Sequence, residues 1–154
     1  AALLQRLLDH YRADLATHSR LFPGLAEVLE AWESSGRPWG VVTNKPARFT
    51  EPLLEALGLS GRMVAVVSGD TLPRAKPHPD PLLHACTAAD CDPSAAVYVG
   101  DAERDIAAGL AAGLRTAVAG WGYLDAADHP DDWGAEIRLA TPADLGRWLA
   151  EPAA

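Results

Sequence analysis

The feature that most constrains the fold is a regular alternation along the chain between short apolar runs and longer amphipathic segments. Each apolar run is only a few residues long and is bounded by turn-forming residues, which is typical of strands buried on both faces of a parallel sheet. The alternation predicts an α/β fold in which helices cover both faces of a parallel sheet. The expected strands lie at 38–43, 63–67, 96–99, 115–119 and 137–139.

Between these runs, apolar residues recur at helical spacing. The expected helices begin near residues 3, 25, 46, 81, 103 and 142. Gly36 and Gly113 are expected to end two of them, because glycine readily takes the left-handed conformation that closes a helix. Asp80 is expected to cap the helix whose first residue is Pro81. In the helix expected from residue 46, Pro52 lacks an amide hydrogen and so limits where the backbone hydrogen bonds can begin.

Charge and cysteine content exclude several classes of protein. The 13 Lys and Arg residues against 21 Asp and Glu residues give a net charge of −8, so nucleic acid or an anionic membrane surface would repel the chain as a whole. Cys86 and Cys91 are too few for a disulfide framework, and no apolar run is long enough to span a bilayer. No charged segment followed by an apolar run and a cleavage site opens the given sequence, so we expect no signal peptide. We therefore expect a cytoplasmic protein with neither nucleic acid nor membrane as a partner.

Polar side chains follow three of the expected strands at the point where each strand ends. Thr43 and Asn44 follow the first, Lys76 comes soon after the second, and Asp101 follows the third, with Asp105 four residues later. Ligands of open parallel sheets bind at the carboxyl ends of the strands, so these residues are the candidate site.

Each candidate residue has a structural and a functional interpretation. Asp101 and Asp105 share one side of a helix start, where they can hold Mg²⁺ or simply cap the helix. Thr43 can bind a phosphate oxygen or serve as a cap. Lys76 precedes Pro77, which favours an extended backbone, so its ammonium can reach inward or remain a solvated surface charge. Residue spacing alone leaves these alternatives open.

Taken in chain order, these segments resemble motifs two, three and four of the haloacid dehalogenase-like phosphatases. The three segments are 41–45, 76–79 and 100–105. Within that superfamily, 21–24, 67–72 and 76–83 are similar to the phosphoglycolate phosphatase group, which includes enzymes acting on N-acetylmuramic acid 6-phosphate. Segments 120–123 and 132–135 are similar to the enzymes that act on N-acetylmuramic acid 6-phosphate.

The resemblance implies a Rossmann-like core and a Mg²⁺-dependent hydrolase of small phosphomonoesters. By this similarity Thr43 would bind the transferring phosphoryl group next to Asn44, and Lys76 would neutralise its charge. Asp101 would ligate Mg²⁺, with Asp105 as a second ligand or as a supporting partner. The leading substrate is phosphoglycolate, and the alternative is N-acetylmuramic acid 6-phosphate.

The chain departs from the family pattern at the first motif. That motif is an Asp-x-Asp-x-Thr/Val run after the first strand, and its first Asp attacks phosphorus; the chain does not contain it. By alignment, residues 1–20 correspond to the last helix of a small helical cap, and residues 21–154 to the core. The central first strand and most of the cap are then missing, and we expect the chain alone to be inactive.

A missing central strand would leave two open sheet edges, which invite pairing with another chain, for example as a homodimer. A non-catalytic module that binds phosphate or dimerises through those edges is therefore the competing functional hypothesis.

Overall fold

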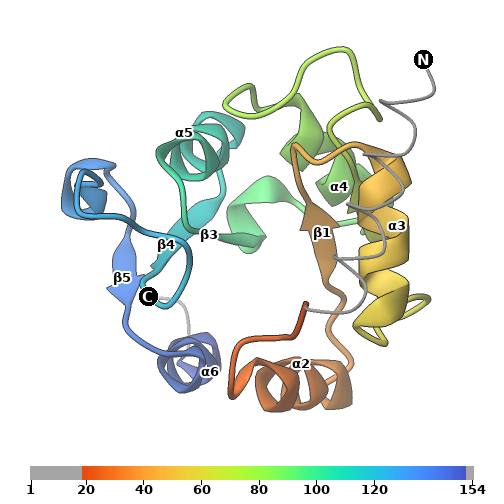
Figure 1. Ribbon diagram of the computed structural model, residues 1–154, viewed down its shortest axis with the longest axis horizontal. Coiled ribbons are helices and arrows are strands. Elements are labelled where there is room, and N and C mark those ends of the chain that lie inside the picture. The colour runs from red at the N-terminus through yellow and green to blue at the C-terminus, as the bar shows by residue number, and fades with distance from the viewer. Residues whose placement is uncertain (1–18, 152–154) are drawn as a thin grey trace, which may run out of the picture.

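The strands form two parallel sheets in the computed structural model, which describes residues 19–151. In the first sheet β1 (Gly40–Val42) pairs with β2 (Ala65–Val67), so that Val41 lies opposite Val66. In the second sheet β4 (Arg115–Ala119) lies between β3 (Val97–Gly100) and β5 (Ile137–Leu139). Figure 1 shows β1 and β3 facing each other across the centre of the molecule. The predicted α/β class and all five predicted strands are confirmed.

The helices follow the predicted alternation. They are α2 (Leu25–Ser34), α3 (Ala47–Ala56), α4 (Asp80–Ala88), α5 (Glu103–Ala112) and α6 (Pro142–Ala150), with short 3₁₀ turns at Pro93–Ala95 and Pro130–Asp132. Gly113 ends α5 with a φ of 80°, as predicted. Thr141 caps α6, because its hydroxyl accepts a hydrogen bond from the Asp144 amide at 3.2 Å.

The predicted start of α4 is wrong by one residue. Pro79 is the N-cap residue, and its carbonyl accepts hydrogen bonds from the amides of Leu82 and Leu83 at 3.0 and 3.1 Å. The Asp80 side chain does not cap the helix, because it pairs with Arg74 and His78 at 2.8 and 3.2 Å.

The second sheet buries a different apolar cluster on each face. Tyr98 packs toward α4 and α5, against a cluster that includes Leu82 and Leu114. Val99, the next residue, packs on the opposite face against a cluster that includes Leu145. Successive strand residues point to opposite faces, so β3 is covered on both sides. Figure 1 shows α2 and α6 lying together on the second of these sides, as their contacts require.

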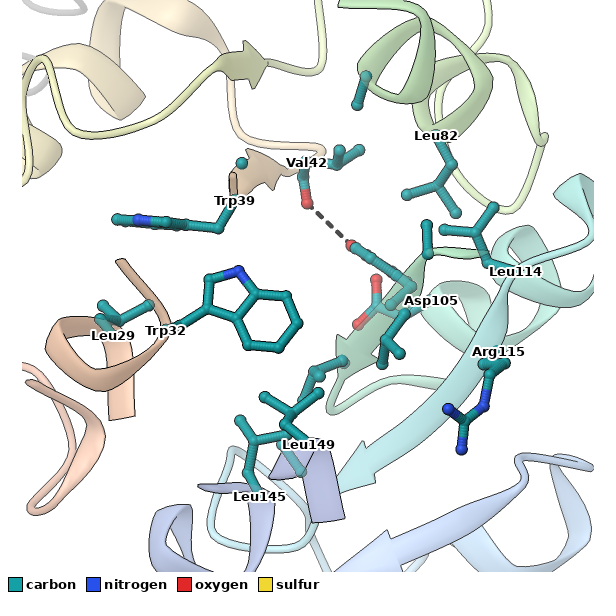
Figure 2. A pocket seen from close by; sticks show the side chains of 18 of the residues that line it. Leu29, Trp32, Trp39, Val42, Leu82, Asp105, Leu114, Arg115, Leu145 and Leu149 are labelled. Carbon is teal, nitrogen blue, oxygen red and sulfur yellow. Dashed lines mark hydrogen bonds between the residues drawn. The ribbon is translucent and has the colours of Figure 1, made fainter. Parts of the chain in front are cut away.

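A cavity of about 1230 Å³ lies between the facing sheets, lined by β1 and β3 and by the helices around them. Figure 2 shows Trp32 and Trp39 on one wall and Leu145 and Leu149 on another. Within residues 19–151, β1 pairs only with β2, and β3 only with β4. This agrees with the sequence-based expectation of two open strand edges that face each other.

The expected helix at 3–15, and with it most of the assigned cap segment 1–20, lies outside the described residues. In the part of the chain that is described, none of the helices has the length and apolar character needed to cross a membrane.

Candidate active site

Lys76 lies at the centre of the candidate site and is only 8% exposed. Its ammonium donates hydrogen bonds to the Asp105 carboxylate at 2.7 Å, to the Tyr98 hydroxyl at 2.7 Å and to the Val42 carbonyl at 3.0 Å. A buried ammonium is stable only when its three donors are matched in this way. The lysine therefore joins the end of β1 to β3 and α5.

Asn44 fixes the backbone of this lysine. The Asn44 amide group donates to the Lys76 carbonyl at 2.8 Å and accepts from the Lys76 amide at 3.0 Å. Gly69 permits the turn that carries Asn44, because a side chain at Gly69 would collide with the Asn44 carbonyl. Both polar atoms of the predicted substrate-binding side chain are thus engaged in positioning Lys76.

Asp105 is also nearly buried, at 6% exposure. One carboxylate oxygen accepts from Lys76, while the other accepts from the backbone amides of Asp101 and Ala102 at 3.2 and 3.1 Å. The carboxylate therefore caps the first turn of α5 and balances the lysine charge. Gly100 lets the two elements approach, because a side chain there would collide with Asp105.

Asp101 is half-buried at the end of β3, and one of its carboxylate oxygens accepts from the Tyr123 amide at 2.9 Å. A Cβ on Gly122 would lie 2.5 Å from the Asp101 Cβ, so only glycine allows this loop to approach the carboxylate. The other Asp101 oxygen has no hydrogen-bond partner that the structure records within residues 19–151.

Thr43 begins the loop after β1, and its amide donates to the Val67 carbonyl at 2.9 Å. Its hydroxyl accepts from the Lys45 amide at 3.1 Å, which leaves the hydroxyl proton available to an acceptor in the cavity. Thr43, Asn44, Lys76, Asp101 and Asp105 all line the same cavity. The structure therefore brings the predicted residues together.

Tyr98 is a site residue that the motif analysis did not select. Its hydroxyl accepts from Lys76 at 2.7 Å and donates to the Val42 carbonyl at 2.9 Å. Burial, followed by the negative charges of Asp105 and Asp101, raises the pKa of Tyr98 well above its ordinary value. The hydroxyl thus stays protonated. A tyrosine inside an otherwise apolar strand was the available signal, because a buried phenol needs a partner.

The residues present fit Mg²⁺ held by few protein ligands. Among residues 19–151 no cluster of three or more His, Cys, Asp or Glu side chains can form a protein cage for a metal. Mg²⁺ commonly binds one or two carboxylates together with water and substrate phosphate oxygens. One Asp101 carboxylate oxygen accepts no hydrogen bond recorded within the described residues and could ligate the cation, whereas both Asp105 oxygens already accept hydrogen bonds.

The parallel α/β core gathers a threonine, a buried lysine and two carboxylates at its strand ends, which is the arrangement that the motif resemblance to haloacid dehalogenase-like phosphatases implied. The chain belongs to the haloacid dehalogenase-like hydrolase family, which it matches over residues 1–119. The predicted membership is confirmed.

Two groups of curated relatives are similar to the chain. It is 43% identical over 144 residues to an N-acetylmuramic acid 6-phosphate phosphatase of Pseudomonas putida, a match covering 94% of the chain and 65% of the relative. It is 42% identical over 153 residues to a phosphoglycolate phosphatase of Xanthomonas campestris, covering 99% of the chain and 67% of that relative. The chain spans slightly less than two thirds of the first relative's length.

A solved structure, described as a predicted phosphoglycolate phosphatase from Haemophilus somnus, has the same fold. Its TM-score is 0.87 at 30% identity, over 94% of the chain and 64% of that structure.

Proposed function

We propose that the chain forms the phosphate-binding and metal-binding part of a Mg²⁺-dependent phosphomonoester hydrolase. The observation that carries the proposal is the buried pair of Lys76 and Asp105, 2.7 Å apart, on the wall of a cavity that Thr43 and Asp101 also line. Phosphoryl transfer has a loose, highly charged transition state, so its catalysis depends on positioned charges and donors. Membership in a hydrolase family supports this reading.

Each residue has a role that follows from its contacts. The Thr43 hydroxyl donates to a phosphoryl oxygen, since its own oxygen already accepts from the Lys45 amide. Lys76 exchanges its bond to the Val42 carbonyl for a phosphoryl oxygen and keeps Asp105 as its counter-ion. The Val42 carbonyl stays satisfied during this exchange, because Tyr98 also donates to it. Asn44 keeps the lysine backbone in place.

Asp101 is the proposed ligand of Mg²⁺. The bound cation supplies positive charge to the phosphoryl oxygens. Asp105, the second residue predicted to hold the metal, orients Asp101 by accepting from its backbone amide at 3.2 Å. The role of Asp105 is therefore to support the ligand and to balance Lys76.

The substrate is a small phosphorylated metabolite. Phosphoglycolate is the leading candidate, on the relatives that carry this name, and N-acetylmuramic acid 6-phosphate is the alternative. Both are small anionic phosphomonoesters, and we propose that the reaction takes place in the cytoplasm.

The nucleophile must come from a strand outside the 154-residue chain. The cavity offers a place for such a strand, because β1 and β3 each have one edge that pairs with no strand among residues 19–151. We propose that a parallel strand bearing the Asp-x-Asp-x-Thr/Val motif occupies this space in a longer protein. Pairing of two copies through the same edges is the competing arrangement, and it would make the chain a non-catalytic module.

Hydrolysis of phosphoglycolate by a longer protein that contains this chain and the missing motif tests the proposal. We expect Mg²⁺-dependent turnover, lowered by about a hundredfold or more in Thr43→Ala and Lys76→Ala. Glu51→Gln, an exposed change on α3, is the control and should keep the wild-type rate.

Rates in Thr43→Ala and Lys76→Ala that match the wild type would show that the pocket is assigned wrongly. A longer protein that binds phosphate but shows no turnover would favour the non-catalytic module. The 154-residue chain alone should show no turnover; activity that disappears in Asp101→Ala would contradict the need for an external nucleophile.

A further inference from the structure

The turn that ends helix α4 brings the two cysteines of the chain together. The Cys91 amide donates to the Cys86 carbonyl at 3.0 Å, and the Asp90 amide donates to the Thr87 carbonyl at 3.1 Å. Asp90 has a φ of 50°, in the left-handed region. These two hydrogen bonds form the Schellman motif that closes many helices. Side chains at the positions that Cys86 and Cys91 occupy in this motif frequently contact each other.

The hydrogen bond between the two residues limits the distance between their Cα atoms. Even as a straight line, the path from the Cys86 Cα through its carbonyl group to the amide and Cα of Cys91 would be only about 7 Å long. The path bends at the carbonyl and at the amide, so the two Cα atoms lie closer than this. Because a disulfide needs Cα atoms about 4.4–6.8 Å apart, the backbone is already within its range.

The two thiols have different surroundings. Cys86 is only 7% exposed and packs in the cluster that includes Leu82 and Leu114. Burial, followed by the negative charges of Cys91 and Asp92, raises the pKa of the Cys86 thiol. Cys91 is half-buried, and its thiol donates to the Asp92 carbonyl at 3.3 Å. A small reagent therefore reaches Cys91 before Cys86.

The position of the Cys91 thiol is fixed from both sides, and the thiol is open to the cavity. On one side it follows the closing turn of α4. On the other side the Asp92 carboxylate accepts from the Ser94 amide at 2.8 Å and caps a short 3₁₀ turn. Both cysteines line the cavity between the sheets, so a small molecule can approach them there.

We propose that Cys86 and Cys91 are a reversible modification site, at which a small-molecule disulfide oxidises the two thiols to an intrachain disulfide. The Cys91 thiolate attacks one sulfur of the oxidant, forms a mixed disulfide and releases the other half of the oxidant as a thiol. The Cys86 thiolate then attacks the Cys91 sulfur and displaces the second half as a thiol. The two cysteines lose two protons and two electrons in total, and the oxidant is reduced to two thiols.

Oxidised glutathione and the 154-residue chain provide the test, with intact mass and free-thiol titration as the measurements. We expect the wild type to lose two hydrogen atoms and both free thiols, to stay monomeric, and to recover both thiols with dithiothreitol. Equilibration with reduced and oxidised glutathione gives the effective concentration of the two thiols. It should be about tenfold higher or more in the native chain than in urea, because the native turn holds the thiols together.

Single cysteine variants separate the two steps. In Cys86→Ser, Cys91 should keep one glutathione as a stable mixed disulfide, because the thiol that would displace it is gone. In Cys91→Ser, Cys86 should remain a free thiol in the native chain, because a buried thiol is poorly reactive.

Variants of the exposed Asp90 test the geometry of the turn. Asp90→Val should lower the native effective concentration about fivefold or more, because a β-branched residue disfavours the left-handed conformation. Asp90→Gly is the matched control and should keep the wild-type value, because glycine takes a positive φ without a steric cost.

Stable addition of glutathione to the wild type, without loss of the two hydrogen atoms, would overturn the modification site. Disulfide-linked dimers as the sole product would overturn it too. The same holds for an effective concentration that is no higher in the native chain than in urea, or that Asp90→Val leaves unchanged. None of these outcomes bears on the proposed function, because the phosphate site uses neither cysteine.

Discussion

The Lys76 ammonium lies 2.7 Å from an Asp105 carboxylate oxygen, and the two side chains are only 6% and 8% exposed. Bringing two charges out of water costs several kcal/mol, which their attraction recovers only if every donor and acceptor is matched. Here the match is complete, because Tyr98 and Val42 take the other lysine donors and two backbone amides bond the other carboxylate oxygen. Substitution of either residue should therefore lower the stability of the fold as well as disturb the site.

Removing one partner of this pair should cost much more stability than removing an exposed pair. We expect Lys76→Met and Asp105→Asn each to lower the free energy of unfolding by about 3–5 kcal/mol, because the remaining charge is buried alone. The double variant should lose less than the sum of the two. Urea denaturation of the four proteins measures this coupling.

The exposed pair of Arg74 and Asp80, 2.8 Å apart, is the matched control. Its side chains are 62% and 32% exposed, so neutralising either residue should cost less than about 1 kcal/mol. Additive effects of the Lys76 and Asp105 substitutions would contradict the coupling.

The buried Tyr98 hydroxyl should contribute more to the free energy of unfolding than the hydroxyl of an exposed tyrosine. Tyr98→Phe removes one acceptor from Lys76 and one donor from Val42, so we expect a loss of about 1–3 kcal/mol. Tyr123→Phe removes a hydroxyl that is largely in water and should change stability by less than about 0.5 kcal/mol. Thermal unfolding of both variants compares the two, and equal shifts would show that the buried hydroxyl contributes nothing.

Much of the fold follows from the sequence because local periodicity specifies it. The expected strands at 115–119 and 137–139 and the helix at 103–112 agree with β4, β5 and α5. The start of α4 was misplaced because Asp80 has competing partners, Arg74 and His78, that local spacing does not reveal. The helix expected from residue 46 begins at Ala47, and Pro52 lies inside it, so this proline did not delay the start of α3.

The candidate site was predictable only as a set of residue types at strand ends. The contacts that hold these residues in place could not be predicted, because they join segments that are far apart in the sequence. Tyr98 and Val42 are 56 positions apart in the chain, and Asn44 and Lys76 are 32 apart. Nothing in the spacing of Asn44 shows that both of its polar atoms bind the lysine backbone, or that Gly122 lies against Asp101. Such contacts arise only after the sheets assemble.

Gly122 should be required for metal binding although it offers no ligand. An added Cβ would lie 2.6 Å from the Asp101 carboxylate oxygen that accepts from Tyr123, so Gly122→Ala must displace that carboxylate. We expect Mg²⁺ affinity, measured by calorimetry with phosphate present, to fall about tenfold or more. In Gly146→Ala the new Cβ would meet only the Val28 side chain at 3.4 Å, so this control should keep the affinity. Unchanged affinity in Gly122→Ala would contradict the assignment of Asp101.

The last prediction concerns acid stability and a contact away from the site. Arg115 in β4 holds Glu136 through hydrogen bonds of 2.6 and 2.9 Å, and this contact lowers the pKa of Glu136 below its ordinary value. A carboxyl whose pKa is lower in the folded state contributes stability above its unfolded pKa, and the contribution is lost as the pH falls through the folded pKa. We therefore expect Glu136→Gln to be less stable than the wild type near pH 7, by about 0.5 kcal/mol for a pair this exposed.

At about pH 3, where an ordinary glutamate is protonated, the difference between Glu136→Gln and the wild type should shrink. Chemical denaturation at the two pH values measures it. The exposed Glu55 side chain on α3 has no hydrogen bond or ion pair that the structure records within residues 19–151, so Glu55→Gln is the control and should leave the stability near pH 7 unchanged. A stability difference for Glu136→Gln that is the same at both pH values would contradict a stabilising role for the charge of the Glu136 carboxylate beside Arg115.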